Sequence, residues 1–206
     1  AGCPACKILL AGPGKTEQEL SLALEHQIGE IHVESMTEAR RIAALVQERS
    51  SQPAPISLRI NPAGAVEGGS MRMGGKPVPF GMDEDLLEDV VGQILQLPEL
   101  EIVGLHLFMG TQILDAQVLL TQYRADIEIA RKLSALLGGR PLKTIDFGGG
   151  LGVPYFSHEQ RLDLAALKTG LEQLVSELQD DPVLAETRFV VEPCRFLVAE
   201  SGLYVA

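Results

Sequence analysis

The sequence predicts an α/β fold in which parallel strands alternate with helices, either as an open doubly wound sheet or as a (β/α)8 barrel. Two observations predict it. Short segments rich in apolar or β-branched residues recur along the 206 residues, and stretches with helical periodicity lie between them. The predicted strands span residues 8–11, 31–33, 56–60, 102–108, 144–147 and 189–191. Such alternation favours parallel strands joined by right-handed crossovers.

The first two predicted helices begin with capping boxes. Thr16 is followed three residues later by Glu19, and Ser35 is followed in the same way by Glu38. In this motif a hydroxyl and a carboxylate bind the first free backbone amides of the helix. We therefore expect helices to start after Thr16 and Ser35.

The other three predicted helices are identified by apolar spacing and by stop signals. The third begins at Asp83 and ends before Pro98. Its apolar residues keep an i, i+3/i+4 spacing and are Leu86, Leu87, Val90, Val91, Ile94 and Leu95. The fourth and fifth helices are predicted over residues 115–137 and 162–178.

A glycine run decides between the two folds. The predicted strand at residues 144–147 leads into Gly148, Gly149 and Gly150, whose bare amides can hold a phosphate, although such a run is also often only a tight turn. An open sheet usually places its phosphate glycines after the first strand, whereas a barrel binds phosphate after strands seven and eight. If two βα units precede this chain, the glycines follow strand seven and residues 192–195 follow strand eight. The sequence thus predicts a TIM-type barrel with about six of its eight strands.

Composition limits the partners. A content of 46% apolar residues is typical of a globular protein. No apolar run approaches the roughly 20 residues of a membrane-spanning helix. A net charge of −11 disfavours nucleic acid and anionic membranes, which leaves small molecules. Cys3, Cys6 and Cys194 form neither a disulfide framework nor a metal site, so a reducing, cytoplasmic protein is expected.

Polar or aromatic residues stand where several predicted strands end, which is where barrel active sites lie. They are Lys15, Arg59, His106, Phe108, Thr111, Glu192 and Arg195. Each has a structural alternative, such as a solvated charge, a buried hydrogen bond or core packing. Together they favour a site, beside a long Gly- and Pro-rich loop at residues 61–82.

Three ordered segments carry a family resemblance. Residues 104–112 (GLHLFMGTQ), 145–152 (IDFGGGLG) and 192–195 (EPCR) resemble signatures of the fold-type III pyridoxal-phosphate decarboxylases. That family includes diaminopimelate, ornithine and arginine decarboxylases. Residues 12–15 and 33–38 resemble its earlier strands, and residues 71–81 resemble the branch that acts on carrier-bound or siderophore intermediates.

The resemblance implies pyridoxal 5'-phosphate as cofactor and assigns residues to it. The phosphate would be held by Thr111, Gly148, Gly149, Gly150, the backbone at Cys194, and Arg195. Glu192 would face the pyridine nitrogen, Phe108 would lie against the ring, and Arg59 would stand near the cofactor or substrate. Two departures are visible, because most members carry histidine at the position of Phe108 and glycine at that of Cys194.

The resemblance also implies a larger enzyme that decarboxylates an amino acid or an amino-acid derivative, free or carrier-bound, and that works as a homodimer. Residues 1–202 would be a partial barrel and residues 203–206 the start of a C-terminal β domain. The Schiff-base lysine would lie on a strand that this chain lacks, so we expect the chain alone to be inactive. The alternatives are a barrel racemase or cofactor carrier, which Glu192 disfavours, and a catalytically dead homologue that acts as a binding module.

Overall fold

The protein is described by a computed structural model over residues 2–49, 52–63, 71–72, 80–108 and 110–202. Most of the loop predicted at residues 61–82, and residues 203–206 with their predicted domain start, lie outside the described residues. Within the described part, no helix combines the length and the apolar character needed to cross a bilayer.

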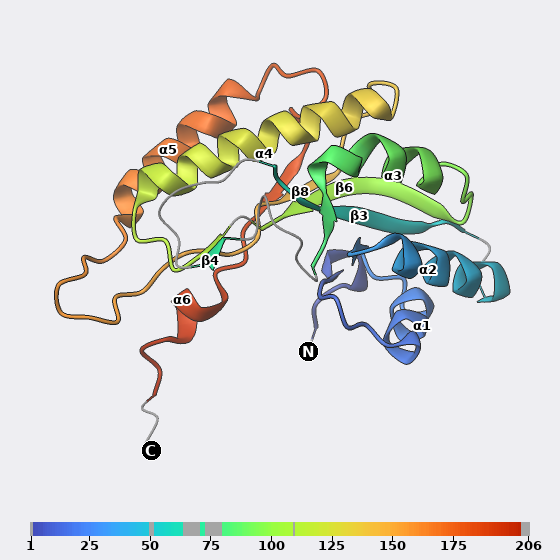
Figure 1. Ribbon diagram of the computed structural model, residues 1–206, viewed down its shortest axis with the longest axis horizontal. Helices are drawn as coiled ribbons and strands as arrows, with labels where there is room; N and C mark the ends of the chain where they lie inside the picture. Colours follow the sequence, from blue (N-terminus) through green and yellow to red (C-terminus); the bar gives the residue numbers. More distant parts are fainter. Residues whose placement is uncertain (1, 50–51, 64–70, 73–79, 109, 203–206) are drawn as a thin grey trace.

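A curved sheet of parallel strands forms the centre of the fold (Figure 1). Its strand order follows the sequence: β1 (Leu9–Leu10), β2 (Glu30–Val33), β3 (Ala54–Asn61), β6 (Leu100–Leu107), β8 (Thr144–Asp146) and β9 (Arg188–Val190). The short β5 (Met82–Asp83) pairs in parallel with the end of β3, and β4 (Met71–Arg72) pairs antiparallel with β7 (Gly110–Thr111). Within the described residues β1 and β9 are the open edges, so the six predicted strands form a half-barrel.

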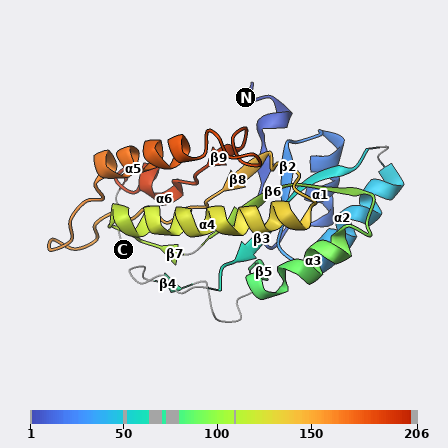
Figure 2. The same cartoon turned by 90° about the horizontal axis from the view of Figure 1, so that it is seen from above.

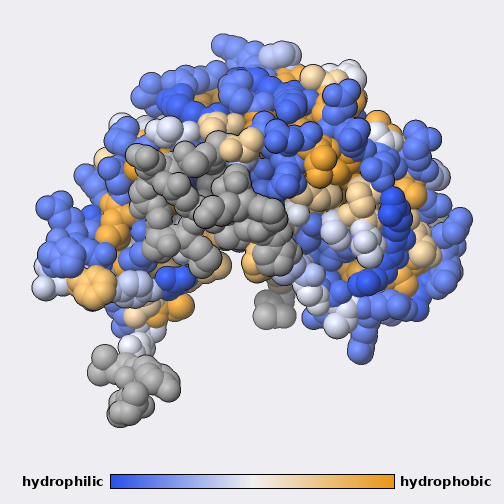
Figure 3. Space-filling view, in the orientation of Figure 1, coloured by the Kyte–Doolittle hydropathy of each residue, from blue (hydrophilic) through white to orange (hydrophobic). Residues whose placement is uncertain are grey.

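Five helices lie along the convex face of this sheet (Figures 1 and 2). They are α1 (Glu17–Glu25), α2 (Met36–Arg49), α3 (Leu87–Ile94), α4 (Ala116–Leu136) and α5 (Leu164–Glu177). A sixth, α6 (Cys194–Val198), follows β9. Because the parallel strands follow in sequence order, right-handed crossovers place the connecting helices on one face. The outward surface of the molecule is mostly hydrophilic in the view of Figure 3.

One of the two predicted capping boxes is complete. The hydroxyl of Thr16 accepts from the Glu19 amide, and the Glu19 carboxylate accepts from the Thr16 amide. At α2 only half of the motif is present. The Ser35 hydroxyl accepts from the Glu38 amide, but the Glu38 carboxylate accepts from the backbone amide of Glu34 instead of that of Ser35.

The prediction for the third helix was wrong at its ends. Residues after Asp83 first form a 3-10 turn, η2 (Glu84–Leu86), and the α-helix begins at Leu87. Leu86 is 50% exposed and Leu95 is 54% exposed, so neither belongs to the buried stripe. The tighter 3-10 turn rotates Leu86 off that stripe, and Leu95 lies beyond the last helical residue.

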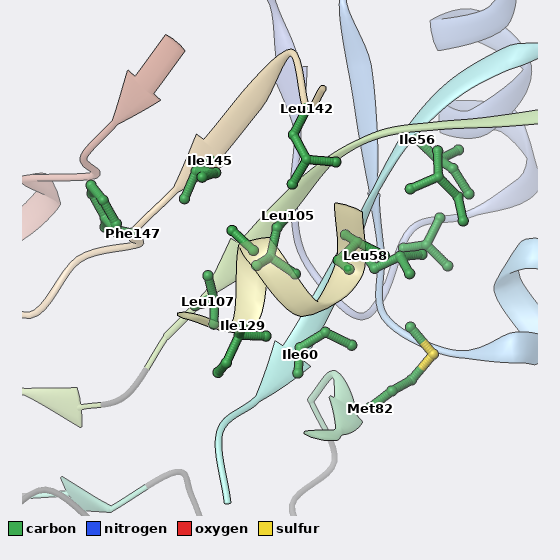
Figure 4. Packing of buried hydrophobic residues seen from close by; sticks show 14 of the residues in the cluster. Ile56, Leu58, Ile60, Met82, Leu105, Leu107, Ile129, Leu142, Ile145 and Phe147 are labelled. Carbon is green, nitrogen blue, oxygen red and sulfur yellow. The ribbon is translucent and has the colours of Figure 1, made fainter. Parts of the chain in front are cut away.

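The two faces of the sheet differ because successive side chains of a strand point to opposite sides. Toward the helices, β3 presents Ile56, Leu58 and Ile60, and these residues belong to one apolar core with Leu105, Leu107 and Ile145 (Figure 4). The opposite face is polar yet buried. Its side chains are Glu30, His32, Glu34, Ser57, Arg59, Asn61, His106, Thr144 and Asp146.

A glycine lets β6 lie between two strands. The register of β3 against β6 shifts at Ile56 and Ser57, so that Ser57 pairs with Gly104. A Cβ on Gly104 would lie 2.5 Å from the Ser57 hydroxyl and 2.5 Å from the carbonyl oxygen of Thr144. The close approach of three strands therefore requires glycine at this position.

We expect Gly104→Ala to lower the free energy of unfolding by about 1–3 kcal/mol, because the strands must separate to admit the methyl group. The matched control is Gly92→Ala on the exposed side of α3, where a Cβ meets no atom within 4 Å. That change should raise stability by up to about 1 kcal/mol through helix propensity. Chemical denaturation measures both, and equal effects would contradict the packing argument.

Candidate functional site

The carboxyl ends of the strands bring the predicted residues together at one edge of the half-barrel. Arg59 is the residue that connects several of them. Its guanidinium carbon lies 5.2 Å from the ring centroid of Phe80 and 5.8 Å from that of Phe108. Nη1 of Arg59 donates to both carboxylate oxygens of Glu34, at 2.9 and 3.0 Å. Its Nε is buried without a hydrogen-bond partner among the described residues.

Glu34 fixes the position of that arginine. Besides Arg59, its carboxylate accepts from the backbone amides of Gly12, at 3.2 Å, and Gly81, at 3.1 Å. One buried carboxylate thus ties the loop after β1, the end of β3 and the segment before β5 to a single point. Sequence reasoning assigned Glu34 no role in the site.

Lys15 has a structural role, because its ammonium group has no donor left for a ligand at the site. Its Nζ donates to the carbonyl oxygens of Gly12, at 2.6 Å, and His32, at 2.7 Å, and to the Glu38 carboxylate at 3.0 Å. These three bonds use all the donors of an ammonium group. The other Glu38 oxygen accepts from the Glu34 amide at 2.8 Å. Lys15 and Glu38 therefore hold the loop that carries Glu34.

A second buried group of side chains, the acid–histidine cluster, consists of His32, His106, Asp146 and Glu192. One polar atom from each lies within 4.8 Å of those of the others. The two imidazole rings have their centroids 4.5 Å apart. His106 and Glu192 were expected at the site, whereas His32 and Asp146 were missed. The polar residue at every second position of β2 and β8 was the signal that could have found them.

Burial sets the electrostatics of this cluster. It lowers the pKa of His106 well below the usual range of histidine, and the neighbouring His32 adds to this effect. Burial also raises the pKa of Glu192, and the charge of Asp146 raises it further. The pKa of Asp146 is likewise raised by burial. All three groups are thereby shifted toward their uncharged forms.

The glycine run lies directly beside Glu192. Gly148 and Gly150 have φ of +66° and +108°, and a Cβ on Gly148 would lie 2.4 Å from the Leu107 carbonyl oxygen. The Gly148 carbonyl accepts from the Glu192 amide, and the Gly148 amide donates to Asp146 Oδ1, both at 2.8 Å. Among the described residues, the amides of Gly149 and Gly150 have no acceptor. Two adjacent free amides suit an anion with several oxygens, so the turn fits a phosphate group.

The three remaining predicted residues lie in segments that approach this turn, since Thr111 follows Gly110, and Cys194 and Arg195 come shortly after Glu192. Thr111 is half-buried in β7, and Cys194 and Arg195 are exposed at the start of α6. The Arg195 guanidinium donates to the Tyr155 hydroxyl at 2.7 Å. The role of these three residues in binding the phosphate stays a prediction.

A family model described as "Pyridoxal-dependent decarboxylase, pyridoxal binding domain" matches residues 1–199. The chain belongs to this family. The resemblance, the half-barrel fold and pyridoxal phosphate as the cofactor are thereby confirmed. The residues present fit that cofactor, because the amides of Gly149 and Gly150, which have no acceptor in the described part of the chain, stand beside a carboxyl group that can face a ring nitrogen.

Named relatives agree with the family. The L-glutamyl-(BtrI acyl-carrier protein) decarboxylase of Niallia circulans is 34% identical over 205 residues, which are 100% of this chain and 47% of that protein. The 2-[(L-alanin-3-ylcarbamoyl)methyl]-2-hydroxybutanedioate decarboxylase of Staphylococcus aureus is 32% identical over 98% of this chain and 49% of its own length. The diaminopimelate decarboxylase of Helicobacter pylori, solved with L-lysine, is 30% identical, with a TM-score of 0.79 over 97% of this chain and 48% of that one. The chain thus spans about half the length of the curated relatives it matches.

Lys15→Met should lower the free energy of unfolding by about 3–5 kcal/mol, because it leaves the buried Glu38 carboxylate without a cation. Lys168→Met is the matched control, since Lys168 pairs with Glu172 on an exposed helix face. We expect that change to cost less than about 0.5 kcal/mol. Urea denaturation of both variants tests this, and a small loss for Lys15→Met would show that the Lys15–Glu38 pair is not needed.

Proposed function

We propose that the whole protein is a pyridoxal-phosphate-dependent decarboxylase, a carbon–carbon lyase that acts on an amino acid or an amino-acid derivative. One observation supports this most directly. The glycine turn with its two free amides is bonded to Glu192 through the Gly148 carbonyl at 2.8 Å. A phosphate cradle and a carboxyl group for the ring nitrogen are thus held at a fixed spacing by one backbone contact.

In this proposal the phosphate binds to the amides of Gly149 and Gly150, with Thr111, the backbone at Cys194 and the Arg195 guanidinium around it. Arginine suits this position because its planar fork matches phosphate oxygens. The amide of Gly148 already donates to Asp146. Gly148 therefore contributes its positive φ and its small size instead of a hydrogen bond.

When bound, pyridoxal phosphate supplies an electron-withdrawing ring that accepts the electron pair released as CO2 departs. Glu192 holds a proton at the ring nitrogen, because a carboxylate there stabilises the protonated form. Phe108 provides an apolar surface beside the ring. Among the described residues Arg59 donates from Nη1, to Glu34, so its other donors can bind a substrate carboxylate or the cofactor.

Relatives suggest the range of substrates and partners. The Niallia circulans protein is named for a glutamyl group on an acyl-carrier protein, and the Helicobacter pylori enzyme was solved with L-lysine. We propose a free or carrier-bound amino acid, with a carrier protein as possible partner. We also propose a cytoplasmic homodimer, in which residues 1–202 belong to the barrel and residues 203–206 begin a further domain.

The full-length protein with pyridoxal phosphate should show the absorbance of a lysine-bound cofactor and should release CO2 from an amino acid or from an aminoacyl carrier protein. Glu192→Gln should keep the cofactor and lower kcat by about 10²-fold or more, since a preorganised charge is removed. Glu172→Gln, on the exposed face of α5, should change neither.

A full-length protein that binds no cofactor would contradict the proposal and favour a dead homologue. A protein that binds the cofactor and racemises amino acids without releasing CO2 would overturn the decarboxylase assignment and favour the racemase.

A further inference from the structure

Three side chains of the acid–histidine cluster have no role in the proposed function. His32 on β2, His106 on β6 and Asp146 on β8 are each no more than 2% exposed. They converge beneath Glu192, the group assigned to the ring nitrogen. Burying three titratable groups at one place is costly, so their arrangement requires an explanation.

Most polar atoms of the cluster lack a partner among the described residues. Both ring nitrogens of His32 and of His106, and Oδ2 of Asp146, are buried without a hydrogen bond. Leaving a buried polar atom without a hydrogen bond is costly. A protonation state of the carboxyl groups that gives Asp146 Oδ2 a partner is therefore favoured.

The two carboxyl groups can pair only if one carries a proton. Oδ1 of Asp146 accepts from the Gly148 amide, which leaves Oδ2 for Glu192. A carboxylate is an acceptor only, so two ionised carboxylates cannot bond to each other, whereas a protonated Oδ2 becomes a donor. Burial raises the pKa of both groups, and their mutual hydrogen bond raises the pKa of Glu192 while it lowers that of Asp146, in agreement with one proton held between the two carboxyl groups.

The lysine and arginine that act on the cluster are already paired elsewhere. Lys15 pairs with Glu38, and Arg59 pairs with Glu34. Glu30 Oε1 also lies 3.7 Å from His32 Nε2 and adds a further negative charge. A single negative charge on the pair of carboxyl groups is thus the favoured state.

We propose that His32, His106 and Asp146 are positioning residues that keep one proton between Asp146 Oδ2 and Glu192, so that this pair carries a single negative charge beneath the cofactor's ring nitrogen. The inference rests on the proposed function. A neutral His106 fits it, because a protonated imidazole beside Glu192 would compete with the protonated ring nitrogen for the carboxylate. The proton between the two carboxyl groups forms the hydrogen bond that fixes the orientation of Glu192.

The proton can be detected without cofactor by infrared spectroscopy of the full-length protein. A buried, protonated carboxyl group has a C=O stretching band distinct from those of carboxylates and amides. We expect such a band at neutral pH, and its loss in Asp146→Asn. Asparagine keeps an acceptor for the Gly148 amide and a donor for Glu192, so the fold should be preserved.

Asp126→Asn is the matched control, because Asp126 is a second buried carboxyl group whose pKa burial raises well above the usual range. It lies on α4, away from the strand ends. Its replacement should remove a different infrared component, keep that of Asp146 and leave the affinity for pyridoxal phosphate unchanged.

The link to Glu192 is tested by Glu192→Gln. With its anionic neighbour removed, Asp146 should lose its proton at a pH lower by about one unit or more, followed as the midpoint of its infrared band. Asp146→Ala, which cannot donate, should weaken pyridoxal-phosphate binding about tenfold or more. Asp146→Asn should restore the affinity to within about threefold of wild type.

Two results would overturn the inference. One is the absence of any Asp146-dependent protonated band at neutral pH. The other is a stoichiometric divalent metal ion in the purified protein that is lost in both His32→Ala and Asp146→Ala, which would make the cluster a metal site. Failure of the proposed function is separate, because it would appear as absent cofactor binding while the infrared band of the cofactor-free protein still reports the proton.

Discussion

The two-residue period of the parallel strands is the constraint on which the rest of the structure depends. It sends Ile56, Leu58 and Ile60 of β3 toward the helices and sends Ser57, Arg59 and Asn61 to the opposite face. The outer face is stabilised by apolar packing. The inner face is buried as well, so every polar group on it needs a partner or a change of protonation. The candidate site is the part of this polar inner face that lies at the strand ends.

The inner face meets this requirement in two ways. Lys15, Glu38, Glu34 and Arg59 form a ladder in which each charge faces an opposite charge or a backbone amide. That ladder is rigid and fixes Arg59. Most polar atoms of the acid–histidine cluster have no partner among the described residues, and burial shifts His106, Asp146 and Glu192 toward neutral forms. A group of paired charges holds geometry, whereas a group with unpaired polar atoms is suited to hold or release a proton.

Much of the fold could be predicted because its signals are local. The apolar strand segments, the Thr16 capping box and the long helix after Asp115 depend on neighbouring residues only. The ends of α3 and the partner of the Glu38 carboxylate were mispredicted, since both depend on contacts beyond the helix itself. Lys15 was correctly predicted to lie near the carboxyl ends of the strands. Its structural role could not be predicted, because its partners lie up to 23 residues away in the sequence.

The sequence by itself determined the alternation of strands and helices, the glycine turn and the family. Each of these depends on the spacing of motifs or on the periodicity of apolar residues, which are properties of the sequence. It also determined that Glu192 and the glycines follow adjacent strands. Only the tertiary structure decided that Asp146 and two histidines meet beneath Glu192, and that the Gly148 amide is already used. Hydrogen bonding and burial depend on which strands become neighbours. Residues that meet in space can lie far apart in the sequence, so the sequence alone does not show these contacts.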